Sequence, residues 1–200
     1  MAFTVLHVCT GNICRSPMAE RLTVLGLQER GLDGVEVGSA GTWGHTGSPM
    51  EPEALVALEE YGVDGSGFRA RELVAEHVVA ADLVLGATRE HRAAAVVLQP
   101  RAAARTFTLR EFARLAGAVD PAALPDGSTE ERARALVRLA AAQRGLVPPD
   151  SPRDDDLSDP YHAPQSQFVR CAALIEQALR GPLDLLAART MGALDGGATA

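Results

Sequence analysis

Patterns typical of buried strands and of helices alternate along most of this chain of 200 residues. Short apolar runs bounded by glycine or polar residues predict strands over 3–8, 34–38, 81–86 and 105–109. Apolar residues at helical spacing predict helices that begin near residue 16 or span 51–61, 88–98 and 165–180. Such alternation is typical of parallel strands joined by helical crossovers. We therefore expect an α/β protein with three layers, α/β/α, around a small parallel sheet of about four strands.

The stretch over 116–156 does not follow this alternation. It contains a helical pattern that opens with a capping box, Ser128 followed by Glu131, and turn-forming residues lie on both sides. We interpret it as an inserted surface helix with flexible flanks, within a single domain over 1–200. Gly181-Pro182 is expected to end the last helix, and a flexible tail is expected from about residue 190.

The most unusual residues lie in the loop after the first strand, in the run HVCTGNICRSP at 7–17. Five residues separate Cys9 from Arg15, and Ser16-Pro17 opens a helix, where proline suits the first position. A loop between a strand and a helix N-terminus directs its backbone N–H groups to one point, which makes an anion site. Gly11 relieves steric limits in such a loop, and Asn12 tolerates left-handed backbone.

A cysteine at the base of this loop would be close to the N–H groups, the helix N-terminus and Arg15, and each favours thiolate over thiol. The thiolate is the nucleophile, and the planar guanidinium can hold two phosphate oxygens, as lysine cannot. The pattern therefore predicts a nucleophile, a cation and a row of donors around one tetrahedral oxyanion.

Simpler interpretations of these residues also exist. Cys9 could be a buried thiol at a strand end, because free cysteine is often simply buried. Cys9 and Cys14 could form half of a metal site, but no second pair or suitable histidine cluster follows them. The loop is not a Walker motif, since the Gly-Lys-Ser/Thr ending is missing.

Charge and composition exclude several function classes. The net charge of −7 argues against general nucleic-acid binding, which needs a basic surface. No apolar run approaches the length that spans a bilayer, and no leader pattern precedes the first strand, so neither membrane association nor secretion is expected. Cys9, Cys14 and Cys171 are an odd number and do not make a disulfide framework. A cytoplasmic protein with reduced thiols is expected.

The run VCTGNICRSPMAE at 8–20 closely resembles the active-site loop of the low molecular weight protein-tyrosine phosphatase family. Segments in the family's order follow it: SAGT at 39–42 after the second strand, a helix from Pro49, the strand over 81–85, Asp159-Pro160-Tyr161 and a closing helix from Phe168. The resemblance covers most of 3–180, apart from 116–156. It implies a cysteine-dependent phosphatase with its phosphate-binding loop after the first strand, and no metal or cofactor.

The resemblance also implies roles for single residues. Cys9 attacks phosphorus and becomes phosphocysteine, while Arg15 binds the phosphate. Asp159 protonates the leaving oxygen and later activates water. Ser39 is expected to hold the loop asparagine in a strained conformation, and Ser16 to donate to the Cys9 thiolate. The phosphate-binding loop consists of Thr10, Gly11, Asn12, Ile13, Cys14 and Ser16.

Other residues of the site are open to two interpretations. Cys14 either forms a reversible disulfide with Cys9, which protects the nucleophile from overoxidation, or is a small packed side chain. Asp159 could be a plain loop aspartate beyond the acidic run 154–156, which we interpret as a solvated face. Cys171 lies on an apolar helical stripe and is expected in the core.

The expected substrate is a phosphorylated protein side chain. Trp43 and Tyr161 are expected to wall the pocket, and aromatic walls suit a phosphorylated phenol. The segment from Ala81, with Thr88 where tyrosine phosphatases usually carry aspartate, instead resembles the protein-arginine phosphatase branch. Where this chain has Ile13, that branch carries threonine, and where it has Tyr161, that branch usually carries phenylalanine. The tyrosine phosphatases carry isoleucine at the first of these positions, as this chain does. We therefore favour phosphotyrosine over phosphoarginine, because an apolar wall and a hydroxyl wall select different groups.

Further functions are less favoured. One type of arsenate reductase relays oxidation through a cysteine pair after the third strand, and residues 82–98 contain no cysteine. A thiol-coupled reductase that needs only Cys9, or a phosphate-binding module without turnover, stays open. The expected partners are a phosphotyrosine protein and a cognate kinase of bacterial type, with inorganic phosphate as the product and no nucleic acid or membrane.

Overall fold

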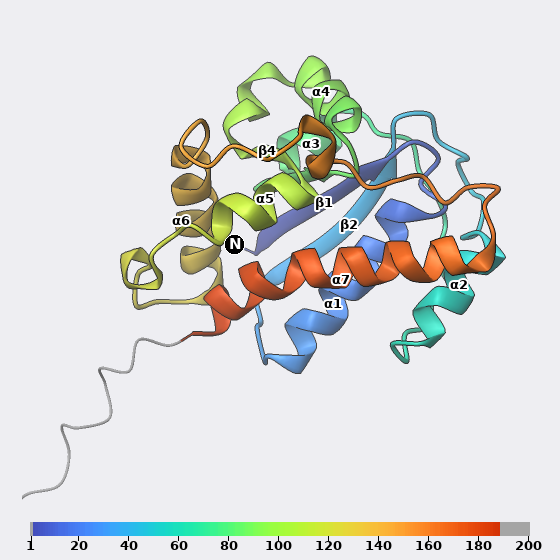
Figure 1. The fold of residues 1–200 in the computed structure, drawn as a ribbon, viewed down its shortest axis with the longest axis horizontal. Coiled ribbons are helices and arrows are strands. Elements are labelled where there is room, and N and C mark those ends of the chain that lie inside the picture. Colours follow the sequence, from blue (N-terminus) through green and yellow to red (C-terminus); the bar gives the residue numbers. More distant parts are fainter. Residues whose placement is uncertain (1, 189–200) are drawn as a thin grey trace, which may run out of the picture.

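One parallel sheet forms the centre of the molecule (Figure 1). The computed structural model describes residues 2–188. The sheet has the order β2-β1-β3-β4, so β1 lies between β2 and β3. The expected parallel sheet is therefore confirmed. The strands are β1 (Phe3–Cys9), β2 (Val35–Gly41), β3 (Leu83–Gly86) and β4 (Thr106–Thr108).

Helices cover both faces of this sheet, which confirms the three layers (Figure 1). α1, α5, α6 and α7 lie on one side, and α3 and α4 lie on the other. The sequence pattern predicts neither α3 nor α5, and it places Leu109, the first residue of α5, in a strand. The helices are α1 (Arg15–Glu29), α2 (Pro52–Glu59), α3 (Ala75–Ala80), α4 (Arg89–Leu98), α5 (Leu109–Ala116), α6 (Thr129–Ala142) and α7 (Gln165–Ala187).

Successive side chains of β1 enter different cores, as the pleat of a strand requires. Val5 belongs to the larger core, under α1 and α7, whereas Leu6 and Val8 belong to the smaller core, under α3 and α4. β2 is longer than the expected 34–38, because it pairs with β1 up to the match of Gly41 with Cys9. The SAG residues therefore lie in the strand and not after it.

α6 is not the surface helix that the sequence predicts. The expected capping box is present, because Ser128 Oγ accepts from the Glu131 N–H. However, Leu136 and Val137 are buried in the larger core, and α6 contacts both α5 and α7. The prediction of a surface helix was wrong because the helix has only a narrow apolar face among many alanines. The sequence pattern does not show that this face packs against other helices. Whether 116–156 is an insertion within one domain over 1–200 stays a prediction.

α7 continues through Gly181-Pro182, where a break was predicted. A proline inside a helix costs about 3 kcal/mol, but burying one leucine side chain contributes about 1.5–3 kcal/mol. Pro182 and Leu183 are both buried. The buried Arg132 of α6 donates to the carbonyl oxygens of Leu185 and Leu186, which supports the end of the helix. The tail predicted from about 190 lies outside the described residues.

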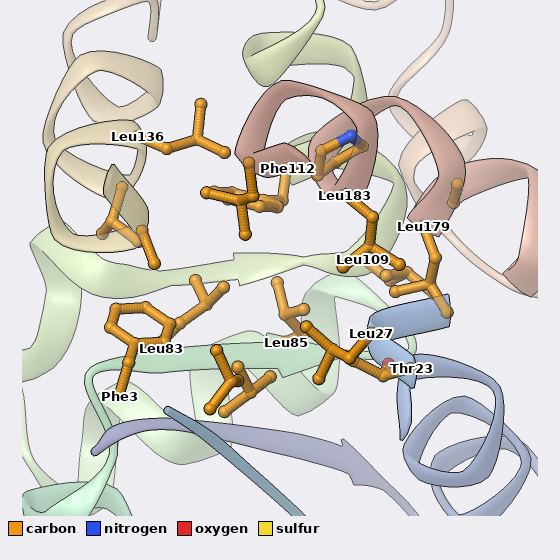
Figure 2. Close-up of a pocket in the computed structure, with 17 residues that line it drawn as sticks. Phe3, Thr23, Leu27, Leu83, Leu85, Leu109, Phe112, Leu136, Leu179 and Leu183 are labelled. Carbon is orange, nitrogen blue, oxygen red and sulfur yellow. The ribbon is translucent and has the colours of Figure 1, made fainter. Parts of the chain in front are cut away.

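A cavity of about 50 Å³ lies in the larger core, near the ends at which β1 and β3 begin (Figure 2). Apolar side chains from the sheet, α1, α5, α6 and α7 surround it, among them Phe3, Leu136 and Leu179. Thr23 is its single polar neighbour, and its hydroxyl donates to the Ala19 carbonyl. The volume is well below the ~150 Å³ of an apolar cavity that holds benzene, and one threonine hydroxyl offers too few partners for a water molecule, so this is a dry packing gap.

None of the helices over 2–188 is both long and apolar enough to cross a bilayer.

The position of β1 in the sheet predicts where a ligand binds. From β1 the chain passes to β2 on one side of it, and it later adds β3 and β4 on the other side. In open α/β sheets, ligands bind at the carboxyl end of the strand where this reversal occurs. That point is Cys9.

Candidate active site

The loop between β1 and α1 lies at this point of reversal. β1 ends at Cys9 and α1 begins at Arg15, so both residues are placed by regular elements. A pocket of about 390 Å³ opens above the loop. Its lining brings together the predicted loop and the predicted walls, and the residues are Cys9, Thr10, Gly11, Ile13, Cys14, Arg15, Trp43, Gly44, His45, Asp159 and Tyr161.

Cys9 lines the pocket, and 2% of the residue is exposed. Its Sγ is 2.9 Å from Ser16 Oγ. Ser16 Oγ accepts a hydrogen bond of 2.8 Å from Asn12 Nδ2, so the hydroxyl proton of Ser16 is available to the sulfur. This is the contact that the sequence resemblance implied for Ser16.

Asn12 has left-handed backbone, with φ of 56°. Its Nδ2 also donates to Ser39 Oγ at 2.8 Å, as expected, and its Oδ1 accepts from the Arg71 N–H at 2.9 Å. Ser39 in turn donates to Glu20 Oε2. Gly41 permits this packing, because a Cβ there would lie 2.5 Å from the Thr10 carbonyl oxygen. The loop is therefore held in one shape by buried hydrogen bonds.

The guanidinium of Arg15 is buried beside the thiol, with 4% of the residue exposed. Its Nη2 donates to Asp159 Oδ2 at 2.5 Å and to Thr10 Oγ1 at 3.3 Å. Its Nη1 donates to the Leu157 carbonyl at 3.3 Å. Within residues 2–188, Nε has no hydrogen-bond partner. A buried guanidinium with a free donor is a ready site for an anion.

The segment before Asp159 is anchored, so the acidic run 154–156 is not the solvated face that we predicted. Asp155 is 8% exposed and pairs with Arg114 at 2.8 Å. Asp156 accepts from the Arg89 N–H at 2.8 Å and pairs with its guanidinium at 2.9 Å. These ion pairs fix the loop to α4 and α5, and Asp159 follows with its side chain half exposed at the pocket.

The two predicted aromatic walls both line the pocket. Trp43 is 81% exposed and Tyr161 is 41% exposed, so each keeps a face free for a ligand. Ile13 also lines the pocket and is 5% exposed, so the loop itself contributes an apolar side chain.

The comparisons with known proteins agree with this geometry. A model of the family described as low molecular weight phosphotyrosine protein phosphatase matches residues 4–148. The chain belongs to this family.

Relatives and solved structures support the assignment. The chain is 35% identical to low molecular weight protein-tyrosine phosphatase A of Mycobacterium tuberculosis over 180 residues, which is 88% of this chain and 87% of that one. It is 41% identical to a protein-arginine-phosphatase of Geobacillus stearothermophilus over 112 residues, or 56% and 72% of the two chains. A low molecular weight protein tyrosine phosphatase from T. tengcongensis superposes with a TM-score of 0.67 at 29% identity, and covers 92% of this chain and 99% of its own.

This low molecular weight phosphatase is thus a cysteine-dependent enzyme of its family. Across residues 2–188, no three His, Cys, Asp or Glu side chains gather in a way that could hold a metal ion. The family model extends into the stretch over 116–156, which the sequence resemblance left out.

Sequence reasoning missed His91 of α4. Its side chain is buried between Thr88 and Thr10, with Nε2 at 2.9 Å from Thr10 Oγ1. Burial and the nearby Arg15 lower the pKa of His91 to about 4. The one signal in the sequence was the capping box of Thr88 with His91 in its last position, and nothing in that pattern indicates a contact with Thr10. Arg71 and Glu20 were missed for the same reason.

The other two cysteines are free and buried. Burial, with charge at Cys9, raises the pKa of Cys14, and burial raises the pKa of Cys171 to about 12. Cys171 lies in the larger core, as expected. The reversible disulfide of Cys9 with Cys14 stays a prediction.

Proposed function

We propose that this enzyme hydrolyses phosphotyrosine in proteins through a phosphocysteine on Cys9. The observation that carries the proposal is one pocket whose lining brings Cys9, Arg15 and Asp159 together with the aromatic side chains of Trp43 and Tyr161. A phosphate group on the loop would contact the backbone N–H groups and the free Nε of Arg15. The aryl ring would then lie between Trp43 and Tyr161.

In the first step, the Cys9 thiolate attacks phosphorus and the bond to the tyrosyl oxygen breaks. Asp159 gives its proton to that oxygen. In the structure its carboxylate contacts Arg15. A phosphate that takes this place on the guanidinium leaves Asp159 beside it, and there the carboxyl group in its protonated form acts as the acid. Arg15 and the loop N–H groups stabilise the charge of the trigonal bipyramid.

In the second step, water attacks the phosphocysteine while Asp159 accepts its proton, and the sulfur leaves as thiolate. The Ser16 hydroxyl, at 2.9 Å, supports the sulfur as negative charge returns to it. Inorganic phosphate is the product, and the residues in place supply the nucleophile, the acid and the cation.

Phosphoarginine is the alternative substrate, which the protein-arginine-phosphatase relative supports. Ile13 weighs against it, because this apolar side chain at the pocket offers no hydrogen bond to a guanidinium. In the cell, the substrate would be a phosphorylated protein, and a tyrosine kinase would be the class of enzyme that supplies it.

The test compares turnover of phosphotyrosine and phosphoarginine peptides of the same sequence by wild-type enzyme and by Ile13→Thr. We expect wild type to favour phosphotyrosine at least about tenfold in kcat/KM, and Ile13→Thr to shift the ratio towards phosphoarginine. Cys9→Ser serves as the blank for both substrates. A wild-type preference for phosphoarginine would overturn the choice of substrate, and turnover by Cys9→Ser would overturn the mechanism.

A further inference from the structure

A chain of hydrogen bonds runs from the start of α4 to the phosphate-binding loop. The Thr88 N–H donates to His91 Nδ1 at 3.1 Å, and Thr88 Oγ1 lies 2.8 Å from the same nitrogen. His91 Nε2 lies 2.9 Å from Thr10 Oγ1. Thr10 Oγ1 then lies 3.3 Å from Nη2 of Arg15. His91 is buried, with 6% exposed.

The contact with the Thr88 N–H indicates which ring nitrogen of His91 carries the proton. A backbone N–H can only donate, so we assign Nδ1 as an acceptor without a proton, and the Thr88 hydroxyl, 2.8 Å from the same nitrogen, then donates to it as well. The ring must then be neutral with its proton on Nε2, which donates to Thr10 Oγ1. The lowered pKa of His91, to about 4, agrees with a neutral ring.

The same accounting orients the Thr10 hydroxyl. Its oxygen faces two donors, Nε2 of His91 and Nη2 of Arg15, and these use both of its lone pairs. Its own proton is left for a third direction. Thr10 lines the pocket, next to the guanidinium nitrogen that also contacts Asp159.

We propose that His91 is a positioning residue that turns the Thr10 hydroxyl into a donor to a nonbridging oxygen of the phosphate. The proposal rests on the proposed function, since it needs a phosphate on Arg15. The added donor stabilises the charge that develops on the phosphate oxygens, and it is set in place before the substrate binds. A loop with an apolar residue in place of Thr10, directly after the nucleophile, would lack this donor to the phosphate.

A purely structural role is the alternative, because His91 also completes the capping box of α4. Two substitutions separate the roles. In His91→Asn, the amide oxygen can replace Nδ1 as the acceptor from Thr88, but no donor reaches Thr10. In His91→Gln, the longer side chain can bring an amide N–H to the place of Nε2. Thr10→Val removes the hydroxyl and keeps the shape.

The experiment measures kcat/KM for an aryl phosphate, the inhibition constant of inorganic phosphate and the melting temperature. We expect about a tenfold loss of kcat/KM and weaker phosphate inhibition in both Thr10→Val and His91→Asn. The double variant Thr10→Val/His91→Asn should be no worse than Thr10→Val alone, and His91→Gln should regain most of the loss. His77→Asn, the same change on α3 outside the pocket, serves as the control.

The proposal would be overturned if the loss of kcat/KM in the double variant equalled the product of the two single losses. It would also be overturned if the inhibition constant of inorganic phosphate in Thr10→Val equalled that of wild type. A His91→Gln that is as slow as His91→Asn would overturn it as well. If His91→Asn does not fold, Thr10→Val and His91→Gln still decide the matter. Activity that depends on Cys9 in every variant leaves the proposed function intact even if this inference fails.

Discussion

The two ends of the sheet hold cavities of opposite character. At the carboxyl end of β1, a pocket of about 390 Å³ is lined by a thiol, a guanidinium and a carboxylate. Near the ends where β1 and β3 begin, a gap of about 50 Å³ is surrounded by aliphatic and phenyl groups (Figure 2). The first consists of groups held in place by hydrogen bonds, and the second is what imperfect packing leaves. Changes at the first should therefore alter turnover, and changes at the second should alter stability.

The largest expected effect is at the carboxyl end. Cys9→Ser should lower kcat for an aryl phosphate by at least about 1000-fold, because the hydroxyl is a far weaker nucleophile than a thiolate. The free energy of unfolding should change by less than about 1 kcal/mol, since the atom is replaced by one of similar size. Stopped assays and urea unfolding of the same preparation measure both. A Cys9→Ser protein whose free energy of unfolding falls by several kcal/mol would contradict the comparison, because the change would then act on stability and not on turnover alone.

Asp159→Asn is expected to lower kcat by about 100-fold, because the amide has no proton to give. The loss should be larger for alkyl phosphates than for p-nitrophenyl phosphate, whose leaving oxygen needs little protonation. Inorganic phosphate should bind at least as well as to wild type, since a carboxylate beside Arg15 no longer competes for it. The two leaving groups and the phosphate inhibition constant test this. An equal loss for both leaving groups would show that Asp159 is not the acid.

At the other end, Leu136→Ala should lower the free energy of unfolding by about 2–5 kcal/mol, because it enlarges an existing gap in the core. Turnover at a temperature where the variant is folded should match wild type. Leu146→Ala is the matched control, because Leu146 is 74% exposed and should cost less than about 0.5 kcal/mol. A change in KM for Leu136→Ala would mean that the two ends are coupled.

The last prediction is a pH dependence of stability that comes from two buried histidines. Burial lowers the pKa of His7 to about 3, and burial with Arg15 lowers that of His91 to about 4. The unfolded chain binds these protons near pH 6.5, so between that value and pH 3–4 the unfolded state holds more protons. Stability is thus complete above about pH 6.5 and is lost as the pH falls towards 3–4. Urea unfolding from pH 8 to 4 measures it, and His91→Gln should flatten the curve in part. A stability that rises on acidification would contradict both neutral histidines.

The fold and the centre of the site could be predicted because both depend on nearby residues. Strand, loop and helix signals stand in sequence order, and Cys9 and Arg15 are six positions apart in one loop. The contacts that complete the site join distant positions. Asn12 bonds to Arg71, and Thr10 bonds to His91, 81 positions away. No local pattern carries such a pairing.

By itself the sequence determined the four strands, most of the helices, the loop that carries Cys9 and Arg15, and the family. Tertiary structure decided that α6 is buried, that α7 passes Pro182 and that the acidic run anchors the Asp159 loop. The physical reason is the same in each case. The free energy of a buried side chain or ion pair depends on which distant group packs against it, and it is as large as the local preference of the residue.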